Sequence, residues 1–153
     1  MGLQEINIEG KILAVSVSQN KGERKSGVEK GLLLPEFGLE TDAHAGKWHR
    51  QVSLLGIESI RKMQENGLDV GPGDFAENIT SQGVDLPSLP LGTQLQIGQE
   101  AVCEVTQIGK ICHDRCAIYK QAGDCVMPRE GIFVRVLKGG TIQAGDSIRV
   151  IFS

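Results

Sequence analysis

Side chains suited to chemistry gather in one stretch of the 153-residue chain, between positions 109 and 131. Three of the four cysteines of the chain lie there, namely Cys112, Cys116 and Cys125. Cys112 has basic neighbours in the sequence: Lys110, His113 and Arg115. Cationic neighbours lower the pKa of a thiol and raise its thiolate fraction. Such a thiolate attacks sulfur, carries a persulfide or binds a soft metal, so the sequence predicts thiolate chemistry on an anionic or metal-bearing partner.

The cysteines admit other interpretations. Cys112, His113, Cys116 and Cys125 could together bind structural zinc, although adjacent Cys-His lacks the usual paired-ligand spacing. Cys112 could also be an exposed, unreactive loop cysteine. Cys103 lies in an alternating strand-like run, where a free cysteine behaves as a small hydrophobic residue, so we expect it to be inert.

Composition excludes several classes of function. The net charge is −3 and aromatic residues make up 4 %, so neither a basic field nor base-stacking platforms point to nucleic acid. The N-terminal residues show no signal-peptide pattern, and no apolar run approaches the ~20 residues of a membrane-spanning helix. We therefore expect no membrane or nucleic-acid partner, a cytoplasmic location with reduced thiols, and a single domain over residues 1–153.

Short apolar runs separated by glycine turns predict a mostly β fold, a closed or partly closed barrel with one or a few short helices. The expected strands cover residues 10–18, 31–34, 51–55, 75–80, 93–98, 101–106, 132–137 and 147–151. Residues 19–31 are polar and basic and predict a loop or edge segment. Ile57, Ile60 and Met63 recur at threefold spacing before Gly67, which predicts a helix over residues 57–66 with a glycine C-cap. A turn is expected at Gly139-Gly140.

Four stretches, in order along nearly the whole chain, carry a resemblance to a known family. The first covers residues 38–46 with "HRQVSLL" at 49–55, and the second is "PGDFAENIT" at 72–80 with residues 83–86. The third joins residues 91–92 to 95–98, and the fourth joins 105–107 to 110–112. Together they resemble the MOSC domain, which is named for the C-terminal region of molybdenum cofactor sulfurases.

The resemblance implies a barrel related to the pyruvate kinase barrel domain, and it places Cys112 at the position of the family's key cysteine. That residue is implied to carry sulfur as a persulfide and is a candidate molybdenum ligand. The stretch from Cys112 to Cys116 departs from the proline-cysteine form of many members. A chain of this length has no room for the pyridoxal-phosphate domain of full sulfurases. The sulfur donor would then be a separate cysteine desulfurase, and the acceptor a molybdoenzyme or a cofactor-biosynthesis protein.

Molybdopterin carries a phosphate and a dithiolene, so its pocket needs cations and hydrogen-bond donors. The residues expected to supply them are His44, Arg50, Asn78, Arg115 and Arg129. Alternatives remain, because Arg50 could pair with Asp42 or Glu77 and Asn78 could cap a turn. Cys116 and Cys125 are expected to assist Cys112 as resolving thiols or additional metal ligands.

The sequence thus predicts a protein that binds a molybdenum cofactor and transfers sulfur through Cys112. One alternative is a non-catalytic module that holds the cofactor for a partner enzyme, with the thiols as bystanders. Another is a structural zinc protein. An oxidoreductase acting on hydroxylated nitrogen compounds ranks below these, because the larger relatives use a reductase partner or a further domain.

Overall fold

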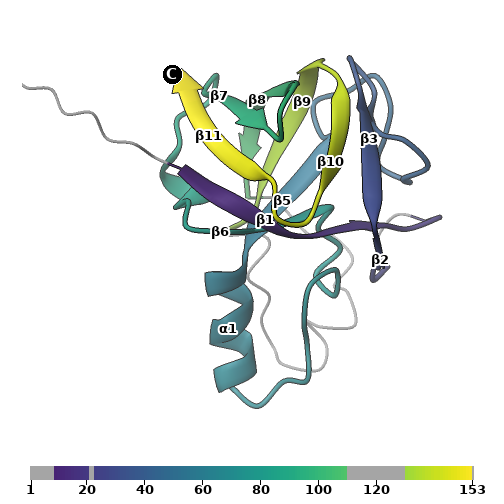
Figure 1. Cartoon of the computed structure of the whole chain (residues 1–153). Helices are drawn as coiled ribbons and strands as arrows, with labels where there is room; N and C mark the ends of the chain where they lie inside the picture. The colour runs from purple at the N-terminus through teal and green to yellow at the C-terminus, as the bar shows by residue number, and fades with distance from the viewer. Residues whose placement is uncertain (1–8, 21–22, 110–129, 153) are drawn as a thin grey trace, which may run out of the picture.

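The computed structural model describes residues 9–20, 23–109 and 130–152. These residues form β-strands, one α-helix and one 3-10 turn (Figure 1). The elements are β1 (Glu9–Val17), β2 (Ser26–Val28), β3 (Lys30–Leu34), β4 (Gly38–Leu39), β5 (Val52–Gly56), α1 (Ile57–Glu65), β6 (Ile79–Gln82), η1 (Leu86–Ser88), β7 (Gln94–Ile97), β8 (Ala101–Ile108), β9 (Ile132–Lys138), β10 (Gly140–Gln143) and β11 (Ser147–Phe152).

Seven of the strands close into a barrel, in the order β1-β6-β5-β9-β8-β7-β11 and back to β1. Strand β1 closes it because it pairs with β6 on one edge and with both β11 and β2 on the other. Neighbouring strands are antiparallel except β5 and β6, which are parallel and are joined through α1. The predicted β-barrel fold is confirmed.

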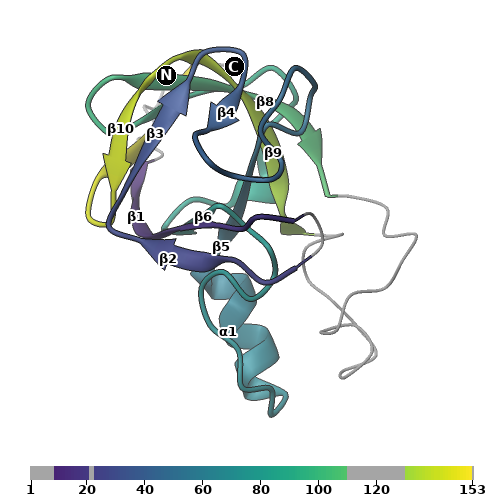
Figure 2. The same ribbon diagram turned by 90° about the vertical axis from the view of Figure 1, so that its right-hand side faces the viewer.

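The barrel interior holds the larger of two hydrophobic clusters, which includes Ile12, Leu54 and Val134. A separate sheet of β10, β3 and β4 lies beside the barrel (Figure 2) and contributes Leu33 and Ile142 to the same cluster. Strand β5 is buried along its whole length because Leu54 faces this interior, whereas Leu55 packs in the second cluster beside α1. The short sheet therefore adds to the barrel core and does not form a core of its own.

Helix α1 lies outside the barrel, below it in Figure 1. Its buried side chains include Ile57, Ile60 and Met63, and each contributes about 1.5–3 kcal/mol by leaving water. The helix ends at Glu65, and Gly67 follows with a φ of +93°, a left-handed conformation that suits glycine. The predicted helix is confirmed. No helix in the described residues is long and apolar enough to cross a membrane.

Two local predictions are wrong. The strand expected over residues 75–80 begins only at Ile79, because Ala76 has a φ of +66° and Glu77 accepts hydrogen bonds from the backbone N–H groups of Gly73 and Phe75. This carboxylate holds a turn where extended backbone was expected. The turn expected at Gly139-Gly140 is also misplaced, because Gly140 already opens β10 and pairs with β3.

Candidate functional site

Several loops meet on the side of the barrel where β8 ends and β1 turns toward β2 (Figure 2). The β4–β5 loop, residues 40–51, is tied to the end of β1 because the Ala43 N–H donates to the Ser18 carbonyl. It is also tied to β8, because Thr106 Oγ1 donates to the carbonyl of His49. This loop carries His44 and Arg50, so both predicted cofactor ligands stand on it.

A fully buried ion pair anchors the start of the loop. Lys25 Nζ lies 2.8 Å from Asp42 Oδ1, and both side chains are completely shielded from solvent. The same ammonium donates to Ser18 Oγ at 2.8 Å. Asp42 in turn accepts the backbone N–H groups of Ser18 and His44, at 3.0 and 2.9 Å. One carboxylate thus joins the start of the β4–β5 loop to the end of β1 and to Lys25 in the segment before β2.

The ion pair sets the charge state of Asp42. Burial by itself raises the pKa of this carboxyl. The hydrogen bond and charge of Lys25, with the N–H groups of His44 and Ser18, outweigh that cost and hold the pKa below its ordinary value of 3.8. Asp42 is therefore an anion at neutral pH, and it compensates the buried ammonium.

His44 lies between this ion pair and an aromatic side chain. Its Nδ1 is 3.4 Å from Lys25 Nζ, and its ring is stacked parallel to that of Trp48 with centroids 6.2 Å apart. Trp48 Nε1 donates to the carbonyl of His44 at 2.7 Å. These contacts fix the plane of the imidazole.

Arg50 and His49 meet at one amide. Gln107 Oε1 accepts from Arg50 Nε at 3.0 Å and lies 2.9 Å from His49 Nε2. The Arg50 guanidinium also lies over the ring of Phe133, 5.4 Å from its centroid. Among the described residues Arg50 pairs with neither Asp42 nor Glu77, the two partners considered from the sequence.

Asn78 lies in the interior, and both ends of its amide are used by the chain. Its Oδ1 accepts from the N–H and the hydroxyl of Ser53, and its Nδ2 donates to the carbonyl of Ser16 at 3.1 Å. The amide thereby joins β1 to β5 just before β6 begins. A role for Asn78 in cofactor binding stays a prediction.

Three residues of this region were not singled out from the sequence as site residues, although Glu77 was considered as a partner of Arg50. Lys25 lay in the polar and basic stretch that predicts a loop or edge segment, and Gln107 was only part of the fourth stretch that carries the family resemblance. Glu77 is fully buried, and its carboxylate accepts from the N–H groups of Gly73 and Phe75 and from Thr80 Oγ1. Burial raises the pKa of Glu77 above 4.5 despite these hydrogen bonds. The only sign of this buried carboxylate in the sequence was the position of a glutamate inside the otherwise apolar and turn-forming string "PGDFAENIT".

The cysteine segment lies outside the described residues. This applies to Cys112, Cys116 and Cys125 and also to the predicted cofactor ligands Arg115 and Arg129. The described chain leaves off at Gly109 and resumes at Glu130, and the two sides are joined because the Gly109 N–H donates to the Gly131 carbonyl. Gln107 Nε2 also donates to the Gly109 carbonyl, at 2.7 Å. The side chain of Gln107, which contacts Arg50 and His49, thus also contacts Gly109, the last described residue before the cysteine segment.

The fourth cysteine, Cys103, is described and is fully buried in the barrel core, and burial raises the pKa of its thiol to about 12. The expectation that it is a core residue is confirmed. The described residues contain no group of three or more His, Cys, Asp and Glu side chains that could hold a metal ion.

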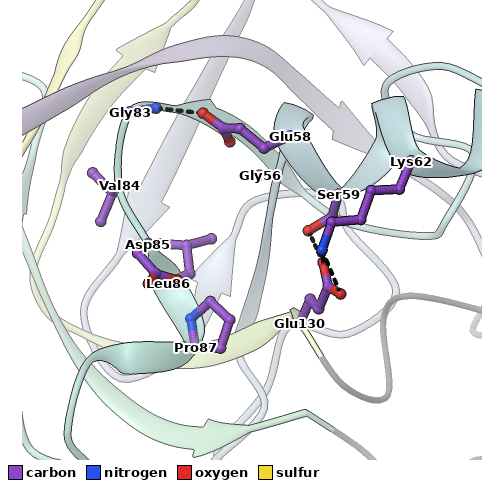
Figure 3. A pocket seen from close by; sticks show the side chains of 10 residues that line it. All are labelled: Gly56, Glu58, Ser59, Lys62, Gly83, Val84, Asp85, Leu86, Pro87 and Glu130. Carbon is purple, nitrogen blue, oxygen red and sulfur yellow. Dashed lines mark hydrogen bonds and ion pairs between the residues drawn. The ribbon is translucent and has the colours of Figure 1, made fainter.

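Two pockets flank the region. One, of about 560 Å³, is lined by Glu36, Lys47, Trp48, His49, Gln51 and Arg135. The other, of about 660 Å³, lies between α1 and the segment after β6 (Figure 3). There Ser59 and Lys62 of α1 both contact Glu130, at 2.5 and 3.0 Å, and Glu58 accepts the N–H of Gly83. The first pocket is the one that contains His49 and Trp48 of the candidate site.

Solved structures with the same fold include YuaD from Bacillus subtilis, with a TM-score of 0.74 and 19 % sequence identity over 96 % of this chain and 98 % of that one. YiiM from Geobacillus stearothermophilus has a TM-score of 0.70 and 19 % identity, over 93 % of this chain and 75 % of that one. YiiM from Escherichia coli has a TM-score of 0.66 and 18 % identity, over 95 % and 70 %. No curated protein matches the sequence.

The sequence matches the model of one protein family. The match covers residues 41–149, which include the β4–β5 loop with His44 and Arg50, the "PGDFAENIT" string and Gln107. The chain belongs to the MOSC domain family.

Proposed function

We propose that this MOSC domain protein binds a molybdopterin-type cofactor and carries sulfur as a persulfide on Cys112. The observation that carries the proposal is the Gln107 bridge, which holds Arg50 and His49 together. Cys112 follows Gln107 by five positions in the sequence, and Gln107 is the residue that contacts both donors. The family is associated with the molybdenum cofactor, which agrees with this arrangement.

The described donors fit such a ligand. Lys47 and Arg50 are cations, and His49 and His44 carry ring nitrogens, so the β4–β5 loop is rich in groups that bind anions. A phosphate and a dithiolene are anionic acceptors, and an arginine fork binds the phosphate with two parallel hydrogen bonds. Arg50, His49 and His44 would hold the cofactor, together with Arg115 and Arg129. When bound, the cofactor would supply a metal centre with sulfur ligands.

The sulfur step needs no oxidant. The Cys112 thiolate attacks the terminal sulfur of a persulfide held on a cysteine desulfurase. A new S–S bond forms on Cys112 while the S–S bond of the donor breaks, and its electron pair leaves on the thiolate of the donor cysteine. The persulfide would then serve a molybdoenzyme or a protein of cofactor biosynthesis.

Intact-mass analysis after incubation with a cysteine desulfurase and cysteine tests this step. We expect the mass of one sulfur atom to be added to the wild-type chain and to Cys116→Ala, and to be absent from Cys112→Ala. Cys116→Ala is the matched control because it removes a thiol from the same segment. An unchanged adduct on Cys112→Ala, or none on the wild type, would overturn the sulfur-carrier function.

Cofactor retention tests the binding function. Arg50→Met should weaken binding of molybdopterin by about tenfold or more, since a hydrogen bond to a charged group contributes about 1.5–3 kcal/mol. Arg61→Met, an exposed position on α1, should bind like the wild type. Pterin fluorescence after anaerobic purification measures both. Equal retention by the two variants would contradict a role for Arg50.

A second candidate is a non-catalytic module that holds the cofactor for a partner enzyme. It is favoured by the same donors on the β4–β5 loop, which need no thiol to bind an anion. Full cofactor retention by Cys112→Ala, combined with no sulfur adduct on the wild type, would select this function over the sulfur carrier.

A further inference from the structure

We propose that the pocket beside Trp48 and His49 receives the pterin ring of the cofactor, and that Gln51 recognises a carbonyl oxygen on the edge of that ring. The identity of the ring rests on the proposed function, whereas the order of donors and acceptors in the pocket does not. The pocket has a volume of about 560 Å³, which suits a small molecule. His49 lines it and contacts the Gln107 amide that also holds Arg50, so the pocket adjoins the donors assigned above to the cofactor.

The side chain of Gln51 is buried and is bonded through its amide oxygen. Gln51 is 2 % exposed, and its Oε1 accepts the backbone N–H of Val136 at 2.8 Å. Val134, two residues earlier on β9, pairs with Val52, so the Gln51 amide continues this edge of the strand beyond the start of β5. Because a backbone N–H can only donate, the amide oxygen must face Val136, and the NH₂ group is the end that remains.

The NH₂ group of Gln51 opens into the pocket. It has no hydrogen-bond acceptor among the residues that the structure describes. Within those same residues, Ser81 Oγ is the only fully enclosed side-chain polar atom without a partner, so Nε2 of Gln51 is not enclosed, and the space that Gln51 lines is the pocket. A buried donor without an acceptor costs free energy, so this wall suits a ligand with an oxygen acceptor.

The charges around the pocket are balanced. Arg135 donates to Glu104 through Nε at 2.7 Å and to Glu36 through a terminal nitrogen at 3.0 Å. Two carboxylates thus share one guanidinium, and Lys47 supplies the second cation. This balance leaves no surplus of positive charge for a phosphate. An uncharged part of the cofactor is therefore the better ligand here, and the phosphate is left to Arg50.

Glu36 supplies an acceptor near the Gln51 donor. Its backbone N–H donates to the Val136 carbonyl at 2.8 Å, so Glu36 and Gln51 are held at the same residue of β9. Arg135 contacts Oε2 of the Glu36 carboxylate, and within the described chain Oε1 is left to accept from a ligand. A pterin ring carries a carbonyl oxygen, a ring N–H and an amino group in a row along one edge. The carbonyl oxygen is assigned to Gln51, and the N–H and amino groups are assigned to Glu36.

Binding of two isomeric pteridines to the full chain tests the assignment. In isopterin the carbonyl and amino groups of pterin exchange places, so an amino group would meet the Gln51 donor. We expect pterin to bind at least about tenfold more tightly, since the mismatched ring leaves a buried donor without an acceptor. The fluorescence anisotropy of each pteridine measures its affinity. Equal affinities, or binding of neither ring, would overturn the proposal.

Gln51→Glu tests the residue itself. The variant keeps an acceptor for the Val136 N–H and places a second oxygen where the NH₂ group was, so we expect it to lose or reverse the preference for pterin. Glu36→Gln changes an exposed side chain and should weaken pterin binding about fivefold. Glu40→Gln removes an exposed carboxylate that does not line the pocket, and it should bind like the wild type. Wild-type binding by Gln51→Glu, or by Glu36→Gln if the first variant does not fold, would contradict the proposal.

The assignment of the pocket and the proposed function fail separately. If the wild type retains molybdopterin but does not distinguish pterin from isopterin, the pocket assignment fails and the proposed function stands. If the pteridines are distinguished as expected but the chain neither retains molybdopterin nor accepts sulfur, the proposed function fails. The pocket then stands as a site for a ring with this order of donors and acceptors.

Discussion

Two buried carboxylates, Asp42 and Glu77, are stabilised in opposite ways. Asp42 faces the ammonium of Lys25 at 2.8 Å, and its pKa lies below the ordinary value. Glu77 has only hydrogen-bond donors around it among the described residues, two backbone N–H groups and one hydroxyl. Its pKa lies above the ordinary value because burial outweighs these donors. Hydrogen bonds alone therefore do not offset the burial of this charge, whereas a paired cation does.

The two carboxylates therefore have different structural roles. The Asp42 region places the ammonium of Lys25 3.4 Å from Nδ1 of His44, a residue of the candidate site. The Glu77 region shapes backbone, because its carboxylate gathers the N–H groups of a turn whose conformation includes a positive φ at Ala76. The buried pair of Asp42 and Lys25 lies beside a residue of the candidate site, and the buried Glu77 holds the loop that leads to β6.

The largest expected effect comes from removing the anion of the ion pair. Asp42→Asn leaves the Lys25 ammonium buried without a counter-charge, which should lower the free energy of unfolding by about 3–5 kcal/mol. The double variant Lys25→Met, Asp42→Asn should recover most of this loss, because no lone charge remains. Urea unfolding of the three proteins measures both effects. If the double variant is as unstable as Asp42→Asn alone, the loss does not come from the unpaired ammonium.

The next effect is at Gly73, which links the two regions. Its carbonyl accepts the N–H of Lys25 and its own N–H donates to Glu77, each at 2.8 Å. Its φ is +90°, and an added Cβ would lie 2.4 Å from the carbonyl oxygen of Lys25. Gly73→Ala should cost about 2–4 kcal/mol from strain and displaced backbone, measured by urea unfolding. Gly67→Ala, which has a similar φ of +93° and open space around it, is the matched control and should cost less.

A smaller effect is expected from Glu77→Gln. The glutamine amide keeps one acceptor oxygen but replaces the other with an NH₂ group. One backbone N–H that donated to the carboxylate then loses its acceptor, which should lower the free energy of unfolding by about 1–3 kcal/mol. The change should alter the turn more than the site, so the nitrogen NMR signals of the His44 imidazole should stay as in the wild type. A His44 spectrum that changes with Glu77→Gln would show that the two regions are not separate.

The smallest expected effect is on the pH dependence of stability, to which Asp42 and Glu77 contribute with opposite signs. The pKa of Asp42 is lowered in the folded chain, so its contribution to stability is present above pH 3.8 and is lost as the pH falls through the folded pKa. The pKa of Glu77 is raised, so its contribution is full below pH 4.5 and is lost as the pH rises through the folded pKa. Each group changes stability by at most about 1.4 kcal/mol per pH unit. Unfolding curves of Asp42→Asn and Glu77→Gln against the wild type should therefore diverge in opposite pH directions, and parallel curves would contradict the assignment.

Much of the fold follows from local patterns. Alternating runs such as 93–98 and 101–106 predicted β7 and β8, and threefold spacing predicted α1, since these patterns depend on near neighbours. Strand β1 shows the limit of this reasoning. A bulge between Ile12 and Ala14 shifts the alternation, so Ile12 and Val15 share the barrel interior although simple alternation put them on opposite faces. Pairing with β6 places that bulge, and the sequence of β1 alone does not reveal it.

The site was less predictable for a related reason. His44 and Arg50 were expected to be near a ligand because of a family resemblance, and the loop that carries them does meet the strand end before Cys112. Lys25 was expected only to lie in a loop or edge segment, and Arg50 was considered as the partner of Asp42 or Glu77. The actual partner of Asp42 comes from a different loop, so the pair forms only once the barrel brings the two loops together. No local pattern marks a lysine for burial.

Closure of the barrel through β1 also sets the timing of folding. The pair Glu9 and Arg149 joins β1 to β11 near the two ends of the described chain. Contacts so distant in sequence form late, because the entropy of a long loop is lost before they contribute. During synthesis this pairing therefore forms only after β11 has been made, whereas the partners β2 and β6 of β1 are made earlier. We expect closure of the barrel by β11 to be the last of the pairings that β1 makes.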